Sequence, residues 1–397
     1  MISVKEATQI VEDCAPVVKP HFVNLEQAGG CVLRETIRAD RDFPPFNRVS
    51  MDGIAIRFAS YAEGRTDFLI RGQVAAGAPP PALPHPAVCM EVATGAVLPE
   101  GADTVIPYED VEITGERAIV YTANIRFQQN VHQQGVDHRV SDILLSPGQR
   151  IGAAEMAILA TTGKTRVLVS PAPRTAIIAT GDELVNIDSA PLPWQIRQSN
   201  PMALQTLLAP WHIKSEIFHC KDDVKSIECL VGKLLSEYDL LLFSGGVSAG
   251  KKDYVPEILA VSGAQIHFHK VAQRPGKPLL FAQHKAGAAV FALPGNPVSA
   301  FLCACRYVIP WIGQRSGLSA TPAEWAFLAA PQSFKPDLTW FLPVSLENDR
   351  GVLRAHAFAG HGSGDLANLH RTNGFLELPQ GQHTFGVSEP FRLIRHR

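Results

Sequence analysis

The spacing of apolar residues is most regular in the middle of the chain. From about residue 172 to 315, short apolar runs of strand length alternate with longer segments of helical period. Strands are expected at 175–179, 213–219, 239–243, 265–269 and 289–293, and helices at 201–208, 224–237, 254–261 and 297–308. This alternation predicts a mostly parallel sheet with helices on both faces, which is a three-layer α/β domain.

The flanking regions carry other patterns. Residues 1–45 begin as a helix, where Ser3 and Glu6 have the spacing of a capping box, and then become extended. Between 46 and 145, short β-like runs are separated by Gly and Pro, which predicts an all-β lobe. Residues 325–397 return to β-like pieces with Gly and Pro turns, and a small β-barrel is expected there.

The composition argues against several classes of binding partner. The net charge is −2 and 19% of the residues are charged, which argues against nucleic acid as a bulk electrostatic partner. No apolar run approaches a membrane span and the N-terminus does not resemble a signal peptide, so no membrane partner and a cytoplasmic location are expected. The 7 cysteines are odd in number and scattered, which argues against a disulfide framework.

Ligands of open α/β sheets bind beyond the carboxyl ends of the strands, so the segments that follow each strand are the first candidates. The first strand leads into 180–183, where a hydroxyl and two acids could bind a metal or a polar ligand. The alternative is that these residues form a helix N-cap or a solvated turn.

The third strand leads into 244–253, whose glycines let backbone N–H groups turn toward one point, as an anion cradle requires. Asp253 at its end is either an N-cap or a carboxylate for Mg²⁺ or substrate.

Two more segments reach the same edge. Asn296 and Pro297 follow the last strand and suit the N-cap and first position of a helix. Residues 270–278, here called the cation loop, hold Lys270, Arg274 and Lys277 among prolines. This loop is either an exposed basic turn or a rigid clamp for phosphate or another oxyanion.

Acids, cations and a Gly-rich cradle therefore meet at one edge of the predicted sheet. The acids are Asp182, Glu183, Asp222 and Asp253. Such a set suits a phosphorylated ligand with a divalent metal. The residue pattern by itself does not name the ligand.

These segments resemble the MoeA family of molybdopterin molybdenumtransferases, which includes the gephyrin E domain. The resemblance is carried by 180–184, 244–248, Asp253 with Tyr254, 275–278 and 293–300, and outside the α/β domain by 45–46, 51–53, 93–96, 99–103, 360–364 and 373–374. It is spread over nearly the whole chain and follows the family's order.

The resemblance implies a homodimer whose subunit has four parts. These are a helical linker region (1–45 and 143–171), a β lobe (46–142), the α/β molybdopterin-binding domain (172–318) and a C-terminal β-barrel (325–397). The implied cleft lies between the α/β domain of one subunit and the β lobe of the other. There, with Mg²⁺ as cofactor, molybdate would be inserted into adenylylated molybdopterin and AMP released. The upstream adenylyltransferase is a further implied partner.

The resemblance also implies roles for single residues. Glu183 and Asp253 would bind the metal and, with Asp52, Lys270 and Arg274, take part in catalysis. Substrate binding would fall to Thr94, Thr180, Gly181, Asp222, Ser244, Gly245, Gly246, Ser248, Lys277, Pro294, Gly295, Asn296, Pro297 and Ser363. Of these residues, Asp52 and Thr94 would come from the partner subunit's side of the cleft.

The sequence departs from the family pattern at Asn47 and Gln198, where acids are usual, and at Arg274, where Lys is usual. Arg48 and Arg197 are added as cations beside the first two positions. These departures keep a non-catalytic molybdopterin-binding or scaffold protein as an alternative. A molybdopterin adenylyltransferase is a second alternative, although stand-alone adenylyltransferases lack the flanking lobes.

Overall fold

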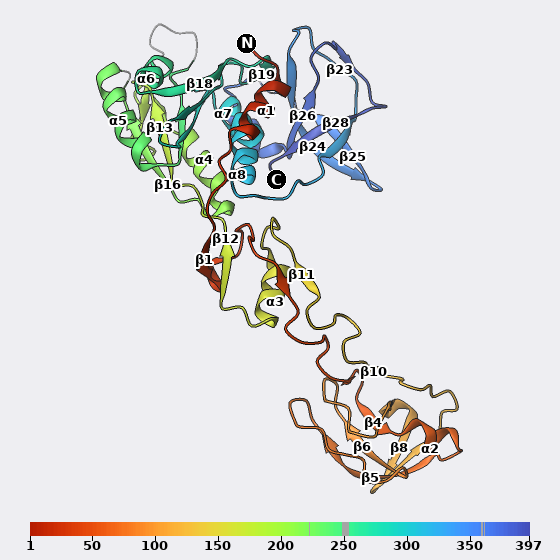
Figure 1. Ribbon diagram of the computed structural model, residues 1–397. Coiled ribbons are helices and arrows are strands. Elements are labelled where there is room, and N and C mark those ends of the chain that lie inside the picture. Colours follow the sequence, from red (N-terminus) through yellow and green to blue (C-terminus); the bar gives the residue numbers. More distant parts are fainter. Residues whose placement is uncertain (222, 248–253, 359, 361) are drawn as a thin grey trace. The chain divides into compact units, whose positions relative to one another are not determined.

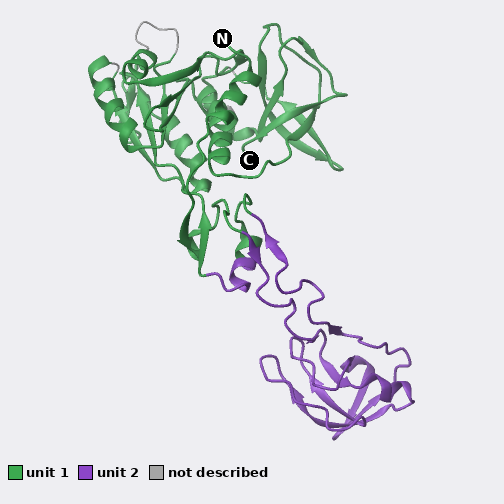
Figure 2. Ribbon diagram, viewed as in Figure 1, with its two compact units in different colours: residues 1–35, 147–156, 165–397 green, residues 36–146, 157–164 purple. Residues whose placement is uncertain are grey.

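The computed structural model describes residues 1–397 except 222, 248–253, 359 and 361. Contacts within the chain divide it into two compact units (Figure 2). Unit 1 comprises Met1–Glu35, Pro147–Met156 and Thr165–Arg397, and unit 2 comprises Thr36–Ser146 and Ala157–Lys164. No helix of the described residues is long and apolar enough to cross a membrane.

The main sheet of unit 1 has the strand order β16-β13-β17-β21-β20-β18 (Figure 1). The bounds are β16 (Ser215–Cys220), β13 (Thr175–Thr180), β17 (Leu240–Ser244), β21 (Ala289–Leu293), β20 (Leu280–His284) and β18 (Ala264–His269). The first four are joined in parallel, whereas β20 pairs antiparallel with both of its neighbours. Each predicted strand is present with small shifts at its ends, and β20 is the strand of this sheet that was not predicted.

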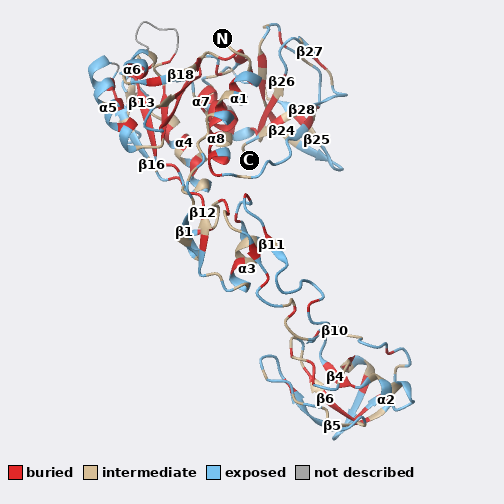
Figure 3. Ribbon diagram, in the orientation of Figure 1, coloured by how far each residue is buried: buried red, intermediate tan, exposed pale blue. Residues whose placement is uncertain are grey.

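Helices cover both faces of this sheet, which confirms the predicted three layers (Figures 1 and 3). Successive strand residues point to opposite faces. Ile177 packs with one set of helices and Ile178 with the other. The first set is α1 (Val4–Asp13), α4 (Asn200–Leu208), α7 (Pro297–Cys303) and α8 (Ile309–Arg315), and the second is α5 (Val224–Glu237) and α6 (Val255–Val261).

The helical segment after β21 is longer and less regular than predicted. A π-helical turn, η4 (Ala304–Val308), joins α7 to α8, and Pro310 occupies the first turn of α8. Proline within an α-helix clashes with the carbonyl group four residues earlier, and a π-helical turn widens the helix at that level. The helix therefore continues through a proline at which the sequence predicts an end.

The C-terminal strands of unit 1 close into a β-barrel, as predicted. Its strands follow the order β24-β25-β22-β28-β26, and β26 pairs back with β24. Their bounds are β24 (Thr339–Asp349), β25 (Val352–Ala357), β22 (Glu324–Leu328), β28 (Pro390–Arg395) and β26 (Gly374–Leu378). A short strand of the cation loop, β19 (Gln273–Arg274), is added in parallel to β24. The barrel is thereby hydrogen-bonded to the α/β domain.

The N-terminal segment also packs on the α/β domain. In the predicted capping box of α1, the Glu6 N–H donates to Ser3 Oγ (3.2 Å) and the Ser3 N–H donates to Glu6 Oε2 (2.8 Å). Val4, Ala7 and Val11 of α1 lie in the core of the α/β domain. After α1, β1 (His21–Asn24) pairs antiparallel with β12 (Arg166–Val169).

Unit 2 is built around a sheet of order β7-β4-β6-β5-β9-β8, so the predicted all-β lobe is confirmed. The bounds are β7 (Thr104–Pro107), β4 (Gly53–Ile56), β6 (Val88–Val92), β5 (Asp67–Val74), β9 (Arg117–Val120) and β8 (Val111–Thr114). A short helix, α2 (Phe58–Ala62), follows β4. The smaller pairs are β2 (Ile37–Arg38) with β11 (Ile143–Leu145) and β3 (Arg48–Val49) with β10 (Val131–His132), and α3 spans Ala153–Thr161.

Candidate functional site

A cavity of about 760 Å³ lies at the carboxyl ends of β13, β17 and β21 in unit 1. This strand-end cavity is lined by most of the predicted substrate-binding residues of the α/β domain, namely Thr180, Gly181, Ser244, Gly245, Gly246, Pro294, Gly295, Asn296 and Pro297. Glu183, predicted as a catalytic and metal-binding acid, lines it too. The structure therefore brings together the segments that follow three separate strands.

The two positions directly after β17 require glycine. Gly245 (φ +106°) and Gly246 (φ +74°) are in conformations that other residues rarely adopt. A Cβ atom on Gly245 would lie 2.9 Å from the Thr180 carbonyl oxygen, and one on Gly246 would lie 2.7 Å from Val255 Cγ2. The two glycines thus let one loop pack closely against the end of β13, which leaves the backbone accessible to a ligand.

Thr180 carries a polar atom that lacks a partner. Its side chain is buried, and Oγ1 has no hydrogen-bond partner among the described residues. Leaving a buried hydroxyl unpaired costs about 1–3 kcal/mol, and most such groups are satisfied in folded proteins. Because Thr180 lines the strand-end cavity, a ligand that reaches this buried atom would supply the missing partner.

Two asparagines connect the walls of this cavity. Asn200 Nδ2 lies 2.8 Å from Ser244 Oγ and 2.8 Å from the Gly295 carbonyl oxygen, so it joins the loops after β17 and β21. Asn200 was not among the predicted site residues. Asn296 occupies the N-cap position of α7, but its side chain makes no capping hydrogen bond. The predicted N-cap position is therefore confirmed, but the side chain donates instead to Ser363 Oγ (2.8 Å) and joins the α/β domain to the barrel.

Two of the departures from the family pattern in unit 1 also lie here. Gln198 and Arg197 line the strand-end cavity. Gln198 Nε2 donates to Asn186 Oδ1 (2.7 Å), while its Oε1 has no partner among the described residues. Arg197 Nε donates to the Ser189 carbonyl oxygen (3.0 Å). Both side chains are therefore anchored by a hydrogen bond at the wall of the cavity.

A second cavity, of about 620 Å³, lies between the cation loop and the barrel. Arg274 and Lys277 line this barrel-side cavity, and neither has an ion-pair partner among the described residues. On the barrel wall, the rings of Phe334 and Trp340 are stacked with centroids 4.7 Å apart. The barrel-side cavity shares Pro278, Pro294 and Asn296 with the strand-end cavity, and Ser363 also lines it. Two unpaired cations thus adjoin the strand-end cavity.

Other predicted residues of unit 1 are placed differently. Lys270 is absent from the lining of both cavities. Its φ of +76° is unusual for a non-glycine residue, and its carbonyl oxygen accepts a hydrogen bond from the Ile2 N–H (3.2 Å). Asp222, Ser248 and Asp253 lie outside the described residues. The described part of the chain holds no cluster of three or more His, Cys, Asp or Glu side chains that could bind a metal by itself.

Unit 2 contains the remaining predicted pair. Asp52 Oδ1 accepts hydrogen bonds from the Thr94 backbone N–H (2.6 Å) and from Thr94 Oγ1 (2.8 Å). These bonds stabilise the carboxylate and hold the pKa of Asp52 below its usual value. Because both residues are exposed, the pair presents a fixed negative charge on the surface of unit 2.

The departures in unit 2 make local contacts. Asn47 Oδ1 accepts from the Gln134 N–H (2.9 Å). An Arg48 Nη atom lies 2.9 Å from His132 Nδ1, and His132 Nε2 lies 3.1 Å from Asp137. These residues therefore hold β3 and β10 together, and the added charge of Arg48 is engaged within unit 2.

Comparison with known families gives one consistent result over three segments. Residues 2–163 match the MoeA N-terminal region (domain I and II), and residues 176–314 match a probable molybdopterin binding domain. Residues 326–392 match the MoeA C-terminal region (domain IV). The three matched segments follow one another without overlap and together span most of the chain.

Curated relatives and solved structures agree with these matches. The chain is 38% identical over 395 residues to a molybdopterin molybdenumtransferase of Synechocystis sp., covering 98% of this chain and 99% of the relative. A protein of that description from Nostoc sp. is 32% identical over 405 residues, with 96% and 91% covered. A molybdopterin biosynthesis MoeA protein from Pyrococcus horikoshii superposes with a TM-score of 0.82 at 25% identity, covering 99% of each chain.

Proposed function

This chain belongs to the MoeA family of molybdopterin molybdenumtransferases, and on that premise we propose that it uses adenylylated molybdopterin and molybdate, inserting the metal with release of AMP. It is thus a transferase of molybdenum cofactor biosynthesis. We place this reaction in the cytoplasm.

The observation that carries the proposal is the adjacency of two unlike cavities. The strand-end cavity offers glycine backbone and hydroxyl groups, which suit phosphate oxygens. The barrel-side cavity offers two unpaired cations, which suit an oxyanion such as molybdate. Because the cavities share Pro278, Pro294 and Asn296, a substrate bound in one can meet an oxyanion bound in the other.

The residues of unit 1 can then be given separate tasks. The backbone of Gly245 and Gly246 and the hydroxyl of Thr180 line the strand-end cavity and bind phosphate oxygens, and the buried Thr180 Oγ1 becomes accessible when the ligand binds. Arg274 and Lys277 hold molybdate and balance its charge. Positioning two reactants in one fixed arrangement accounts for a large part of enzymatic rate enhancement.

A magnesium ion fits this donor set. Mg²⁺ is usually held by one or two carboxylates together with waters and substrate phosphates, so the Glu183 carboxylate on the cavity wall is a sufficient protein anchor. When bound, the ion would offset the charge that develops on phosphate oxygens. Asp253 is a further proposed ligand from the resemblance and lies outside the described residues.

We further propose that the protein acts as a homodimer. In this arrangement Asp52 and Thr94 of one subunit face the α/β domain of the other. The fixed carboxylate of Asp52 supports a role in a polar site, since both hydrogen bonds from Thr94 reach Oδ1 and the residue is exposed. The upstream adenylyltransferase would deliver the substrate.

The test is AMP release from adenylylated molybdopterin by the purified protein, with and without molybdate and Mg²⁺. We expect molybdate-stimulated release that falls at least about 100-fold in Glu183→Ala, as for the loss of a group that acts mainly in the transition state. Glu228→Ala, which changes an exposed acid on α5, is the matched control and should behave as wild type. Retained molybdopterin binding without AMP release would contradict the proposal and favour a non-catalytic binding protein.

A further inference from the structure

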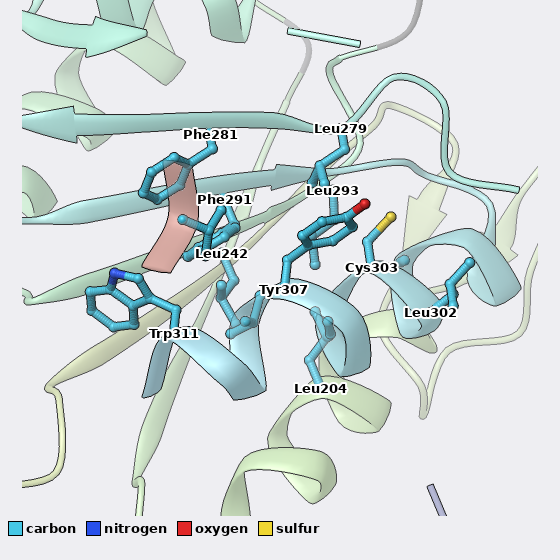
Figure 4. Packing of buried hydrophobic residues seen from close by; sticks show 14 of the residues in the cluster. Leu204, Leu242, Leu279, Phe281, Phe291, Leu293, Leu302, Cys303, Tyr307 and Trp311 are labelled. Atoms are coloured by element: carbon cyan, nitrogen blue, oxygen red, sulfur yellow. The ribbon is translucent and has the colours of Figure 1, made fainter. Parts of the chain in front are cut away.

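A buried polar pair joins the cation loop to the π-helical turn η4. The Gln273 side chain is 0% exposed, and its Oε1 lies 2.5 Å from Tyr307 Oη. Tyr307 is 1% exposed and sits on the π-helical turn η4, where it lies beside Cys303 within an otherwise apolar cluster (Figure 4). Two polar side chains at such depth need a reason, because burying polar groups is favourable only when they are hydrogen-bonded.

The direction of each hydrogen bond follows from the chemistry of the groups. Gln273 Nε2 lies 3.3 Å from the carbonyl oxygens of both Pro275 and Gly276. Carbonyl oxygens only accept, so the amide nitrogen has to face them, and Oε1 has to face Tyr307. The Tyr307 hydroxyl is then the donor. Burial raises the pKa of Tyr307 well above its ordinary value, which keeps this hydroxyl protonated.

The turn that Gln273 holds fits tightly against α7. Gly276 has a φ of +87°, and a Cβ atom there would lie 2.6 Å from Cys303 Sγ and 2.7 Å from Gln273 Nε2. The Val271 N–H donates to the Lys277 carbonyl oxygen (2.9 Å), which closes the turn at its base. The side-chain amide of Gln273 therefore fixes the backbone that carries Arg274 and Lys277.

The same helical turn also holds the barrel. Arg306, next to Tyr307, is buried and pairs with Glu377 of β26 at 3.0 Å. The turn η4 therefore contacts both walls of the barrel-side cavity, the cation loop through Tyr307 and Gln273 and the barrel through Arg306.

We propose that Gln273 and Tyr307 are positioning residues for the transferase reaction. Gln273 borders the barrel-side cavity but is 0% exposed, so both residues act through the turn that presents Arg274 and Lys277 and set the affinity for the oxyanion substrate indirectly. This inference rests on the proposed function, because the oxyanion is the molybdate of that reaction.

The test compares Tyr307→Phe and Gln273→Met with wild type. Each change keeps the size of the side chain and removes hydrogen bonds of the pair. We expect the molybdate concentration for half-maximal AMP release to rise about tenfold, which corresponds to about 1.4 kcal/mol, with kcat changed less than about twofold. Gln205→Met is the matched control, since the Gln205 amide donates to a backbone carbonyl oxygen, that of Ser215, elsewhere in the domain (3.0 Å). It should leave the molybdate dependence unchanged.

The double variant separates positioning from stability. Replacing both polar partners by apolar groups of similar shape is often nearly neutral for folding. In Gln273→Met with Tyr307→Phe, we expect the melting temperature to recover relative to Gln273→Met alone. The half-saturating molybdate concentration should stay raised, because the Pro275 and Gly276 carbonyl oxygens still lack their donor. If that concentration returned to the wild-type value together with the melting temperature, the pair would be structural only and the proposal overturned.

A measurement without turnover keeps this test independent of the proposed function. Hydrogen exchange at the amides of Lys270, Val271 and Leu279 reports on the loop, since these amides donate to the carbonyl oxygens of Leu279, Lys277 and Gly276 and so close it. We expect faster exchange in Tyr307→Phe, and weaker binding of inorganic molybdate in equilibrium dialysis. If wild type released no AMP, the proposed function would fail, while these two changes would still support positioning. Unchanged exchange and binding in both single variants would overturn it.

Discussion

Thr180 is a residue at which folding and ligand binding make opposite demands. Its buried hydroxyl has no partner among the described residues, so Thr180→Val removes a cost from the folded protein. We expect the free energy of unfolding to stay equal or rise by about 1 kcal/mol. Affinity for adenylylated molybdopterin should fall about tenfold, because a phosphate oxygen loses its donor. Chemical denaturation and calorimetric titration measure the two effects.

Thr175 supplies the control for this experiment. It lies on β13 as Thr180 does and is buried, but its Oγ1 donates to the Pro173 carbonyl oxygen at 2.9 Å. Thr175→Val should therefore lower the free energy of unfolding by about 1 kcal/mol and leave the affinity unchanged. Equal effects of the two substitutions on affinity would mean that Thr180 has no contact with the substrate.

Asp52 owes its low pKa to Thr94. The backbone and hydroxyl bonds of Thr94 stabilise the charged form, so the contribution of Asp52 to stability is present above its unfolded pKa near 3.8 and is lost as pH falls through the lower folded pKa. Thr94→Val removes the hydroxyl and keeps the N–H, so the pKa of Asp52 should rise part of the way toward 3.8. Carbon-13 NMR titration of labelled aspartate carboxyls checks this. A pKa that did not move would show that the backbone bond is sufficient.

At the scale of elements, the residue directly after the barrel strand β28 is a histidine suited to a pH experiment. Burial, and then the charge of Arg397, lowers the pKa of His396 from 6.5 to about 4. Its ring lies 5.2 Å from that of Phe301 on α7 and 5.7 Å from that of Phe375 on β26. The folded protein thus favours neutral His396, while the unfolded chain takes up a proton below pH 6.5.

The contribution of His396 to the free energy of unfolding should therefore be fully present above pH 6.5 and be lost as pH falls toward 4. His396→Phe keeps an aromatic ring between Phe301 and Phe375 but cannot be protonated, so this variant should lose less stability over that interval. Urea midpoints measured at several pH values test this expectation. His356→Phe, on the exposed surface of the barrel, should keep the wild-type dependence. A wild-type slope retained in His396→Phe would assign the dependence to other groups.

The elements that the sequence predicts well are those with a strong local signal. Strands of the parallel part of the sheet are short apolar runs between polar segments, and their periodicity is enough to find them. By contrast, β20 follows directly on the cation loop, and only its pairing with β21 and β18 identifies it as a strand. The π-helical turn at η4 has no local signal either, because it accommodates Pro310 inside a helix that tertiary packing stabilises.

At the scale of the whole molecule, one part of the candidate site could be predicted from the sequence and another part could not. Segments that follow parallel strands must meet at one edge, so the strand-end cavity could be predicted from residues such as Thr180 and Gly245. The barrel-side cavity could not, because the pairing of β19 with β24 brings the cation loop to barrel residues such as Phe334, Trp340 and Phe358, which are far away in sequence. Asn200 was missed for a related reason: its two hydrogen bonds join loops far apart in sequence.

The proposed homodimer with a site shared between subunits can be tested with two variants that are expected to be inactive. If Asp52 acts on the α/β domain of the partner subunit, each cleft combines Glu183 of one subunit with Asp52 of the other. Asp52→Asn and Glu183→Gln then change the two different subunits that form a cleft. A hybrid dimer of the two variants then contains one cleft with both changes and one that is intact. Random pairing makes half of the dimers hybrids, so the mixture should recover about a quarter of wild-type activity.

The experiment needs co-expression of the two variants with different tags and measurement of AMP release after purification through both tags. A hybrid purified in this way should have about half of wild-type activity per dimer. Two copies of Glu183→Gln, tagged and purified identically, give the background. If the hybrid were no more active than this background, Asp52 and Glu183 would serve one cleft from the same chain, and the shared site between subunits would have to be abandoned.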